Sequence, residues 1–77
     1  MNKERRKHID EAKELLERAQ SLIQEIADEE QEYYDNMPEG LQNGDKGQAA
    51  SEAVDSLNQS ISNIEDAVSE LDSARDG

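Results

Sequence analysis

Residues 48–74 read QAASEAVDSLNQSISNIEDAVSELDSA, and this stretch decides the fold. Its larger apolar residues recur at alternating intervals of four and three, which is the heptad pattern of a helix that packs against another helix. The Ser and Asn residues between them are mediocre helix formers, so packing must stabilise this helix. The seam consists of Ala50, Val54, Leu57, Ile61, Ile64, Val68 and Leu71.

Small residues form a second row beside this seam. Small side chains let another helix approach closely, so the row is expected to face a second partner helix. It consists of Ala53, Ser60, Ala67 and Ala74.

Residues 3–35 form the other long helical pattern. No Gly or Pro interrupts it, and good helix formers such as Glu, Lys, Ala and Leu dominate it. A helix of this length is about 50 Å long, and its apolar stripe is wider than one neighbouring helix covers. The predicted seam is Ile9, Ala12, Leu16, Ala19, Ile23, Ile26 and Tyr33, widened by Leu15, Leu22, Ala27 and Tyr34.

Residues 36–47 separate the two helical patterns. Pro38 disfavours helical backbone at Met37, and glycines in this segment favour turns. Asp45 followed by Gln48 resembles a capping box, which would start the second helix there.

The predicted fold is all-α: a coiled-coil-like, antiparallel two-helix hairpin that forms a single domain over residues 1–77. Because the chain is short and the apolar stripes are wide, we expect two copies to assemble into a homodimeric four-helix bundle. The predicted oligomer core is Leu16, Ile23, Ile26, Val54, Leu57, Ile61, Ile64, Val68 and Leu71.

Charge is distributed unevenly along the 77 residues, which carry a net charge of −12. Residues 1–18 have a net charge of +1, whereas residues 19–77 have −13. Such a field repels nucleic acid and anionic membranes and attracts basic protein surfaces. The basic start, with Lys3, Arg5, Arg6 and Lys7, is expected to neutralise an acidic helix of a second copy.

The sequence also indicates whether disulfides, membrane spans or a secretion signal are to be expected. The absence of Cys excludes disulfides and thiolate metal sites. No apolar run approaches the roughly 20 residues that span a bilayer, and no apolar segment follows the basic start as in a secretory signal. A cytoplasmic location and no membrane partner are therefore expected.

The segment Glu32–Gln42 reads EYYDNMPEGLQ. It resembles a motif of short, acidic, helical proteins from phages and prophages of Gram-positive bacteria. In these proteins a Glu-rich helix, this turn and an Ala/Ile/Leu-rich second helix follow in the same order. The resemblance covers residues 10–72, and the turn carries its specificity. It implies an accessory phage protein in the host cytoplasm, of the kind that inhibits host defence proteins, as anti-CRISPR proteins do, and it implies no catalytic residues.

Carboxylates are densest beside this turn. On a helix, carboxylates at i and i+4 lie about 6 Å apart, close to the phosphate spacing of a nucleic-acid strand. One hypothesis is a surface that imitates a nucleic-acid backbone and binds a host protein with a basic surface. The alternative is a solvated helix face that keeps the protein in solution. The acidic cluster is Glu25, Asp28, Glu29, Glu30, Glu32, Asp35 and Glu39.

Aromatic and apolar residues gather at the expected tip of the hairpin. Tyr33 and Leu41 are predicted to close the end of the core, with Leu41 folded back on Tyr33. Tyr34 and Met37 suit a partner contact as well as a core position, because Tyr is enriched in interfaces. The predicted partner-binding residues are Glu25, Asp28, Glu29, Glu32, Tyr34, Asp35, Met37 and Glu39.

Catalytic motifs are absent from the sequence. His8 is the only His, and neither a nucleophile elbow nor a phosphate-binding loop occurs. The E-x-x-D pairs resemble magnesium ligands of all-helical nucleotide hydrolases, but Tyr33 stands where a further Glu of that motif belongs. These pairs are Glu25–Asp28, Glu32–Asp35 and Glu52–Asp55.

Three hypotheses of function follow, in this order. The first is a non-enzymatic inhibitor of a host defence or nucleic-acid-processing protein, with no metal, no cofactor and no direct nucleic-acid partner. The second is a structural bundle-forming module without an inhibitory target. The third is a magnesium-dependent nucleotide hydrolase.

Overall fold

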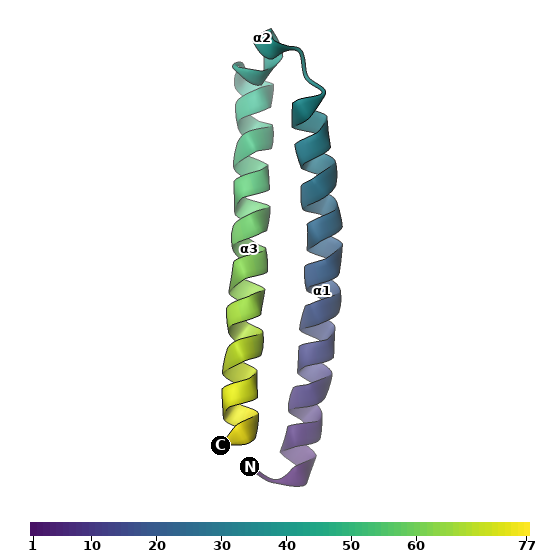
Figure 1. Cartoon of the computed structure of the whole chain (residues 1–77), viewed down its shortest axis with the longest axis vertical. Helices are drawn as coiled ribbons and strands as arrows, with labels where there is room; N and C mark the ends of the chain where they lie inside the picture. Colours follow the sequence, from purple (N-terminus) through teal and green to yellow (C-terminus); the bar gives the residue numbers. More distant parts are fainter.

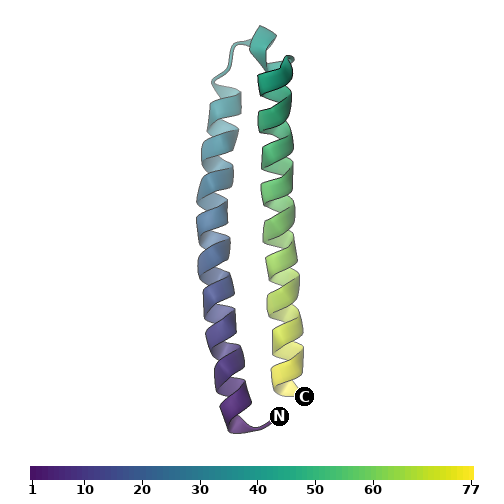
Figure 2. The ribbon, with the colours of Figure 1, turned by 180° about the vertical axis from the view of Figure 1, so that it is seen from behind.

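The computed structural model describes residues 1–77 as three helices and no strands. They are α1 (Lys3–Asp35), α2 (Glu39–Gln42) and α3 (Asp45–Asp76), so the predicted all-α class is confirmed. Figure 1 shows α1 and α3 side by side in opposite directions, with both chain ends at the end far from α2, and Figure 2 shows the same arrangement from behind. The molecule measures 58 × 15 × 12 Å. None of its helices combines the length and apolar character needed to cross a membrane.

The ends of α1 follow from local chemistry. Asn2 caps the start, because its side-chain Oδ1 accepts a hydrogen bond of 2.8 Å from the Arg5 amide. At the other end, the amide of Asn36 donates to the Glu32 carbonyl at 3.0 Å, and Pro38 then prevents a further helical turn. The bounds of α1 coincide with those predicted from the sequence.

The turn is shorter than predicted. A single helical turn, α2, occupies part of it, and α3 begins at Asp45. Gly44 is the N-cap of α3 and has no side chain to form a capping bond, so the predicted capping box is wrong. Asp45 lies instead in the first turn of the helix, where its negative charge interacts favourably with the helix dipole.

The turn packs tightly on the start of α3. Gly47 is buried, and a Cβ atom at this position would clash with the backbone of Gln42. The side chain of Gln42 donates through Nε2 to the Tyr34 carbonyl at 3.0 Å. Gln42 therefore connects the end of α1 to the start of α3.

The core lies along the line where α1 and α3 meet. Alternating spacings of three and four residues on α3 turn one line of small and apolar side chains toward α1. The buried apolar residues are Ala27, Ala50, Val54 and Ile61.

The line of α1 residues that faces α3 departs from the predicted seam at alternate positions, where Lys13 and Gln20 take the places predicted for Ala12 and Ala19. It continues through Ala27, which is 3% exposed, and Tyr34, whereas Ile26 and Tyr33 are 43% and 52% exposed. The predicted seam is therefore wrong at Ala12, Ala19, Ile26 and Tyr33. Both rows keep the alternation of three and four, and the small Ala27 in the observed row lets α3 approach closely.

Candidate protein-interaction surfaces

Two lines of residues define where α1 and α3 meet, and we refer to them as the contact line. The positions repeat every three or four residues, and each of them is buried or half-buried. On α1 they are Ile9, Lys13, Leu16, Gln20, Ile23, Ala27, Glu30 and Tyr34. On α3 they are Gly47, Ala50, Val54, Leu57, Ile61, Ile64, Val68, Leu71 and Arg75.

The contact line divides the molecule into two faces. Successive residues of a helix are about 100° apart around its axis, so a residue that follows a contact position points to one side and a residue that precedes it points to the other. Because α1 and α3 run in opposite directions, the following residues of both helices lie on the same face of the pair (Figure 1). The preceding residues share the opposite face.

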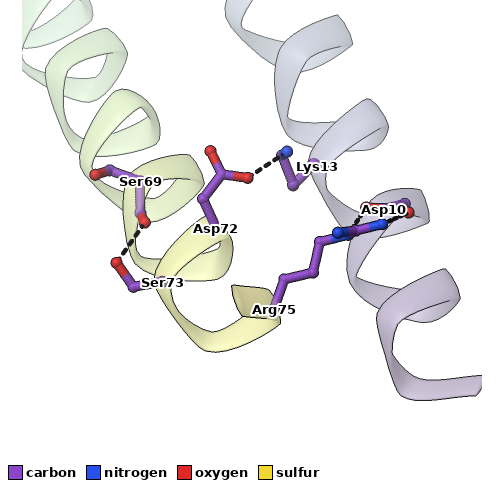
Figure 3. Close-up of polar contacts among 6 residues, drawn as sticks. All are labelled: Asp10, Lys13, Ser69, Asp72, Ser73 and Arg75. Atoms are coloured by element: carbon purple, nitrogen blue, oxygen red, sulfur yellow. Dashed lines mark hydrogen bonds and ion pairs between the residues drawn. The ribbon is translucent and has the colours of Figure 1, made fainter. Parts of the chain in front are cut away.

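Polar contacts between the helices occur on the face of the following residues (Figure 3). Nε of Arg75 donates to Oδ1 of Asp10 at 2.7 Å, and Nη2 donates to Oδ2 at 3.3 Å. Lys13 pairs with Asp72 in the same region. These contacts set the levels at which α1 and α3 lie beside each other.

Lys13 and Arg75, the cations of these two pairs, are stabilised in their charged form. The hydrogen bond from Lys13 to Asp72 raises the pKa of Lys13 above its ordinary value. The hydrogen bond from Arg75 to Asp10 likewise raises the pKa of Arg75. Near the chain ends, therefore, the carboxylates of Asp10 and Asp72 are neutralised by their own molecule.

The face that carries these pairs is strongly anionic, and we call it the acidic face. No Lys or Arg directly follows a contact position in either helix. Away from the two pairs at the chain ends, its carboxylates form no ion pair. The carboxylates of the acidic face are Asp10, Glu14, Glu17, Asp28, Asp35, Asp55, Glu65, Asp72 and Asp76.

The predicted acidic cluster is not gathered on one face. Asp28 and Asp35 lie on the acidic face, whereas Glu25 and Glu32 lie on the outer edge of α1, away from α3. Glu29 precedes a contact position and lies on the opposite face. The sequence-based cluster therefore surrounds the end of α1, and Glu39 lies in α2.

Several carboxylates of the acidic face were not among the predicted site residues. Glu14 and Glu17 lie on α1, and Asp55 and Glu65 lie on α3, far away in sequence from the turn. Selecting the residue after each predicted seam position would have found Glu17, Asp55 and Glu65, whereas Glu14 follows Lys13, which the predicted seam did not contain. The local density of carboxylates pointed instead to the end of α1.

The burial of the aromatic and apolar residues at the turn differs from the prediction. Tyr34 is half-buried because the contact line of α1 reaches it, whereas Tyr33 and Leu41 are 52% and 53% exposed. The prediction that Tyr33 and Leu41 close the core is therefore wrong. Met37 is half-buried and contributes to a shallow hollow of about 280 Å³. The hollow is lined by Tyr33, Asn36, Met37, Pro38, Leu41 and Lys46.

Carboxylates and His do not converge as they would around a bound metal ion. No group of three or more His, Asp or Glu side chains lies close enough together to hold one. A hollow of about 680 Å³ at the chain ends contains Lys3, Arg6 and Lys7 together with acidic residues, so its charge is mixed. His8 is exposed on α1.

Comparisons of the chain with models of protein families, with curated proteins and with solved structures found no match. The function is therefore argued from the surfaces described above.

Proposed function

We propose that this protein binds a host protein with a basic surface and inhibits it, through the acidic face. The partner would belong to host defence or to nucleic-acid processing, since such proteins carry Lys- and Arg-rich channels for nucleic acid. The proposal includes no catalysis, no cofactor and no direct contact with nucleic acid. A phage origin and a cytoplasmic site of action are parts of the proposal that rest on the resemblance of Glu32–Gln42.

One observation carries the proposal. The acidic face bears carboxylates from both long helices, and no Lys or Arg directly follows a contact position. A solvated face that only keeps a protein in solution commonly mixes both signs of charge. Here the positive charge is concentrated near the start of α1: Arg18 lines a shallow hollow with Glu14 and Glu17, and no Lys or Arg follows it in α1. A face of one sign steers an oppositely charged partner and fixes its orientation.

The experiment compares two variants of equal net charge. In the face variant, Glu14→Gln, Glu17→Gln, Asp28→Asn and Asp55→Asn neutralise the middle of the acidic face. In the edge variant, Glu25→Gln, Glu32→Gln, Glu52→Gln and Asp66→Asn neutralise residues on the outer edges of the helices. The amide that replaces the Asp28 carboxylate retains an oxygen that can accept the hydrogen bond of 2.9 Å from Nε2 of Gln24, so local structure is preserved.

The tagged protein and both variants are used to capture proteins from a Gram-positive host lysate at low and at high salt. We expect the wild type and the edge variant to retain a basic protein at low salt and to release it at high salt. The face variant should fail to retain it. Retention by all three proteins would reject the acidic face and direct attention to the exposed Leu41 at the turn.

A second candidate function is favoured by a different observation. The exposed Leu15, Leu22 and Ile26 suit a structural module whose hairpin assembles into a homodimeric four-helix bundle. A module of this kind would form oligomers and capture no basic host protein at either salt concentration.

A further inference from the structure

The face opposite the acidic face is largely apolar, and we call it the apolar face. Large side chains on it are open to solvent, with Leu15 at 64%, Leu22 at 58% and Tyr33 at 52% exposed. On α1 this face consists of His8, Ala12, Leu15, Ala19, Leu22, Ile26, Glu29 and Tyr33. On α3 it consists of Lys46, Ala49, Ala53, Ser56, Ser60, Asn63, Ala67, Glu70 and Ala74.

The two helices contribute side chains of different size to this face. Asp10 lies level with Arg75, and the Gln20 side chain reaches Glu65 at 3.4 Å, so the levels of α1 and α3 are known. At these levels Ala19 lies beside Ala67. The large side chains of α1 therefore form a ridge next to a shelf of small residues on α3, and another helix can approach that shelf closely.

The chain exposes more surface than its mass requires. A compact monomer of 8.6 kDa exposes about 4,700 Å², whereas this chain exposes 5693 Å². The excess is about 1,000 Å², and a protein interface of standard size buries about 800 Å² on each partner. No large side chain is fully buried within the chain. The excess exposed area therefore corresponds to the area that one interface of standard size would bury on this chain.

We infer that a second copy of this chain covers the apolar face, with the two molecules antiparallel. The basic start of α1, with Arg5, would then lie at the turn end of the second copy, where Glu29 and Glu32 carry negative charge. A parallel arrangement would bring two acidic turn ends together, and like charges in an interface are unfavourable.

The spacing of the α1 ridge suits a two-fold axis across its middle. The positions of the ridge are symmetric, so antiparallel pairing places Leu15 opposite Ile26 of the second copy. Likewise, Ala19 lies opposite Leu22 of the second copy, so that a small side chain packs against a large one. Such an interface leaves the two acidic faces on opposite outer surfaces of the dimer. This inference does not depend on binding through the acidic face, since it concerns the other face of the molecule, which is also the face used by the second candidate function.

Cysteine cross-linking tests the pairing directly, because the chain has no Cys. Leu15→Cys and Ile26→Cys proteins are mixed and oxidised. We expect a disulfide between the two different variants and little between identical ones. Identical residues of two antiparallel α1 helices would be about 16 Å apart along the axis, too far for a disulfide.

Glu17→Cys mixed with Gln24→Cys is the matched control, because these positions occupy equivalent levels on the acidic face. They should not cross-link. Equal cross-linking of the control pair would overturn the inference. So would preferential bonding of identical variants, or the absence of a disulfide between the Leu15→Cys and Ile26→Cys proteins.

Sedimentation equilibrium supplies a second readout. The wild type should have twice the chain mass of 8.6 kDa at micromolar concentration. Ile26→Glu should shift the equilibrium toward the monomer at least about tenfold, because it places a carboxylate in a desolvated seam. Gln24→Glu, on the acidic face, should leave the dimer intact. A wild-type protein that stays monomeric would contradict the inference.

Discussion

Gly47 is the residue at which the turn and α3 approach most closely. A Cβ atom at this position would meet the Gln42 backbone, which has no flexible end that can move away. Close packing therefore requires a glycine at position 47, although a glycine within a helix is intrinsically unfavourable. Gly40, in α2, has open space where a Cβ atom would lie.

We expect Gly47→Ala to lower the stability by about 1–3 kcal/mol, because the turn must move away from α3. Gly40→Ala should leave the stability unchanged or raise it slightly, since Ala favours helix. Thermal melting followed by circular dichroism measures both. Equal melting temperatures for the two variants would show that the turn does not depend on close packing at Gly47.

The pair of Lys13 and Asp72 predicts how the stability of the fold depends on pH. Its pKa is raised by the hydrogen bond to Asp72, so the pair stabilises the fold below the ordinary titration range of lysine and loses this effect as the pH rises through the raised pKa. Melting temperatures measured from pH 8 to strongly alkaline conditions should fall less steeply for Lys13→Gln than for the wild type. Lys3→Gln is the control, and a similar profile for both variants would count against the pair.

At the scale of the helix, one shift of register separates the sequence prediction from the structure. Both long helices, their approximate ends and the contact line of α3 could be predicted, because the pattern of α3 is regular. On α1 the predicted row of Ala12, Ala19, Ile26 and Tyr33 is more apolar than the adjacent row of Lys13, Gln20, Ala27 and Tyr34, which is the one that faces α3. The structure places Ala27 inside, at 3% exposed, in the same row as Lys13 and Gln20, and leaves Ile26 43% exposed. The acidic face depends on this register, which explains why local charge density indicated only part of it.

Ala27→Leu tests this register. A large side chain at a position that is 3% exposed must push α1 and α3 apart, so we expect a loss of about 1–3 kcal/mol. If Ile26 faced α3 instead, Leu would be tolerated at position 27. Urea denaturation distinguishes these outcomes, and Ser62→Leu, at an exposed position outside the apolar face, is the control.

For the whole molecule, the net charge of −12 opposes folding and favours binding. Carboxylates of the same chain repel one another, and added salt screens this repulsion. The same salt also screens attraction to a basic partner.

We therefore expect the melting temperature to rise between about 20 and 500 mM NaCl, a range over which the Debye length falls several-fold. Partner binding should weaken over the same range. Calorimetric melting curves measure the first effect. A melting temperature that falls with salt would mean that attractive ion pairs outweigh the repulsion.

The most direct test of the account is the affinity of the captured partner for the face variant and the edge variant, measured by titration calorimetry at several salt concentrations. The two variants have the same net charge, so a difference between them reports the position of the charges. We predict that neutralising Glu14, Glu17, Asp28 and Asp55 weakens binding about tenfold or more and flattens its salt dependence, whereas the edge variant stays near the wild type. Equal affinities of the two variants would contradict the assignment of binding to the acidic face.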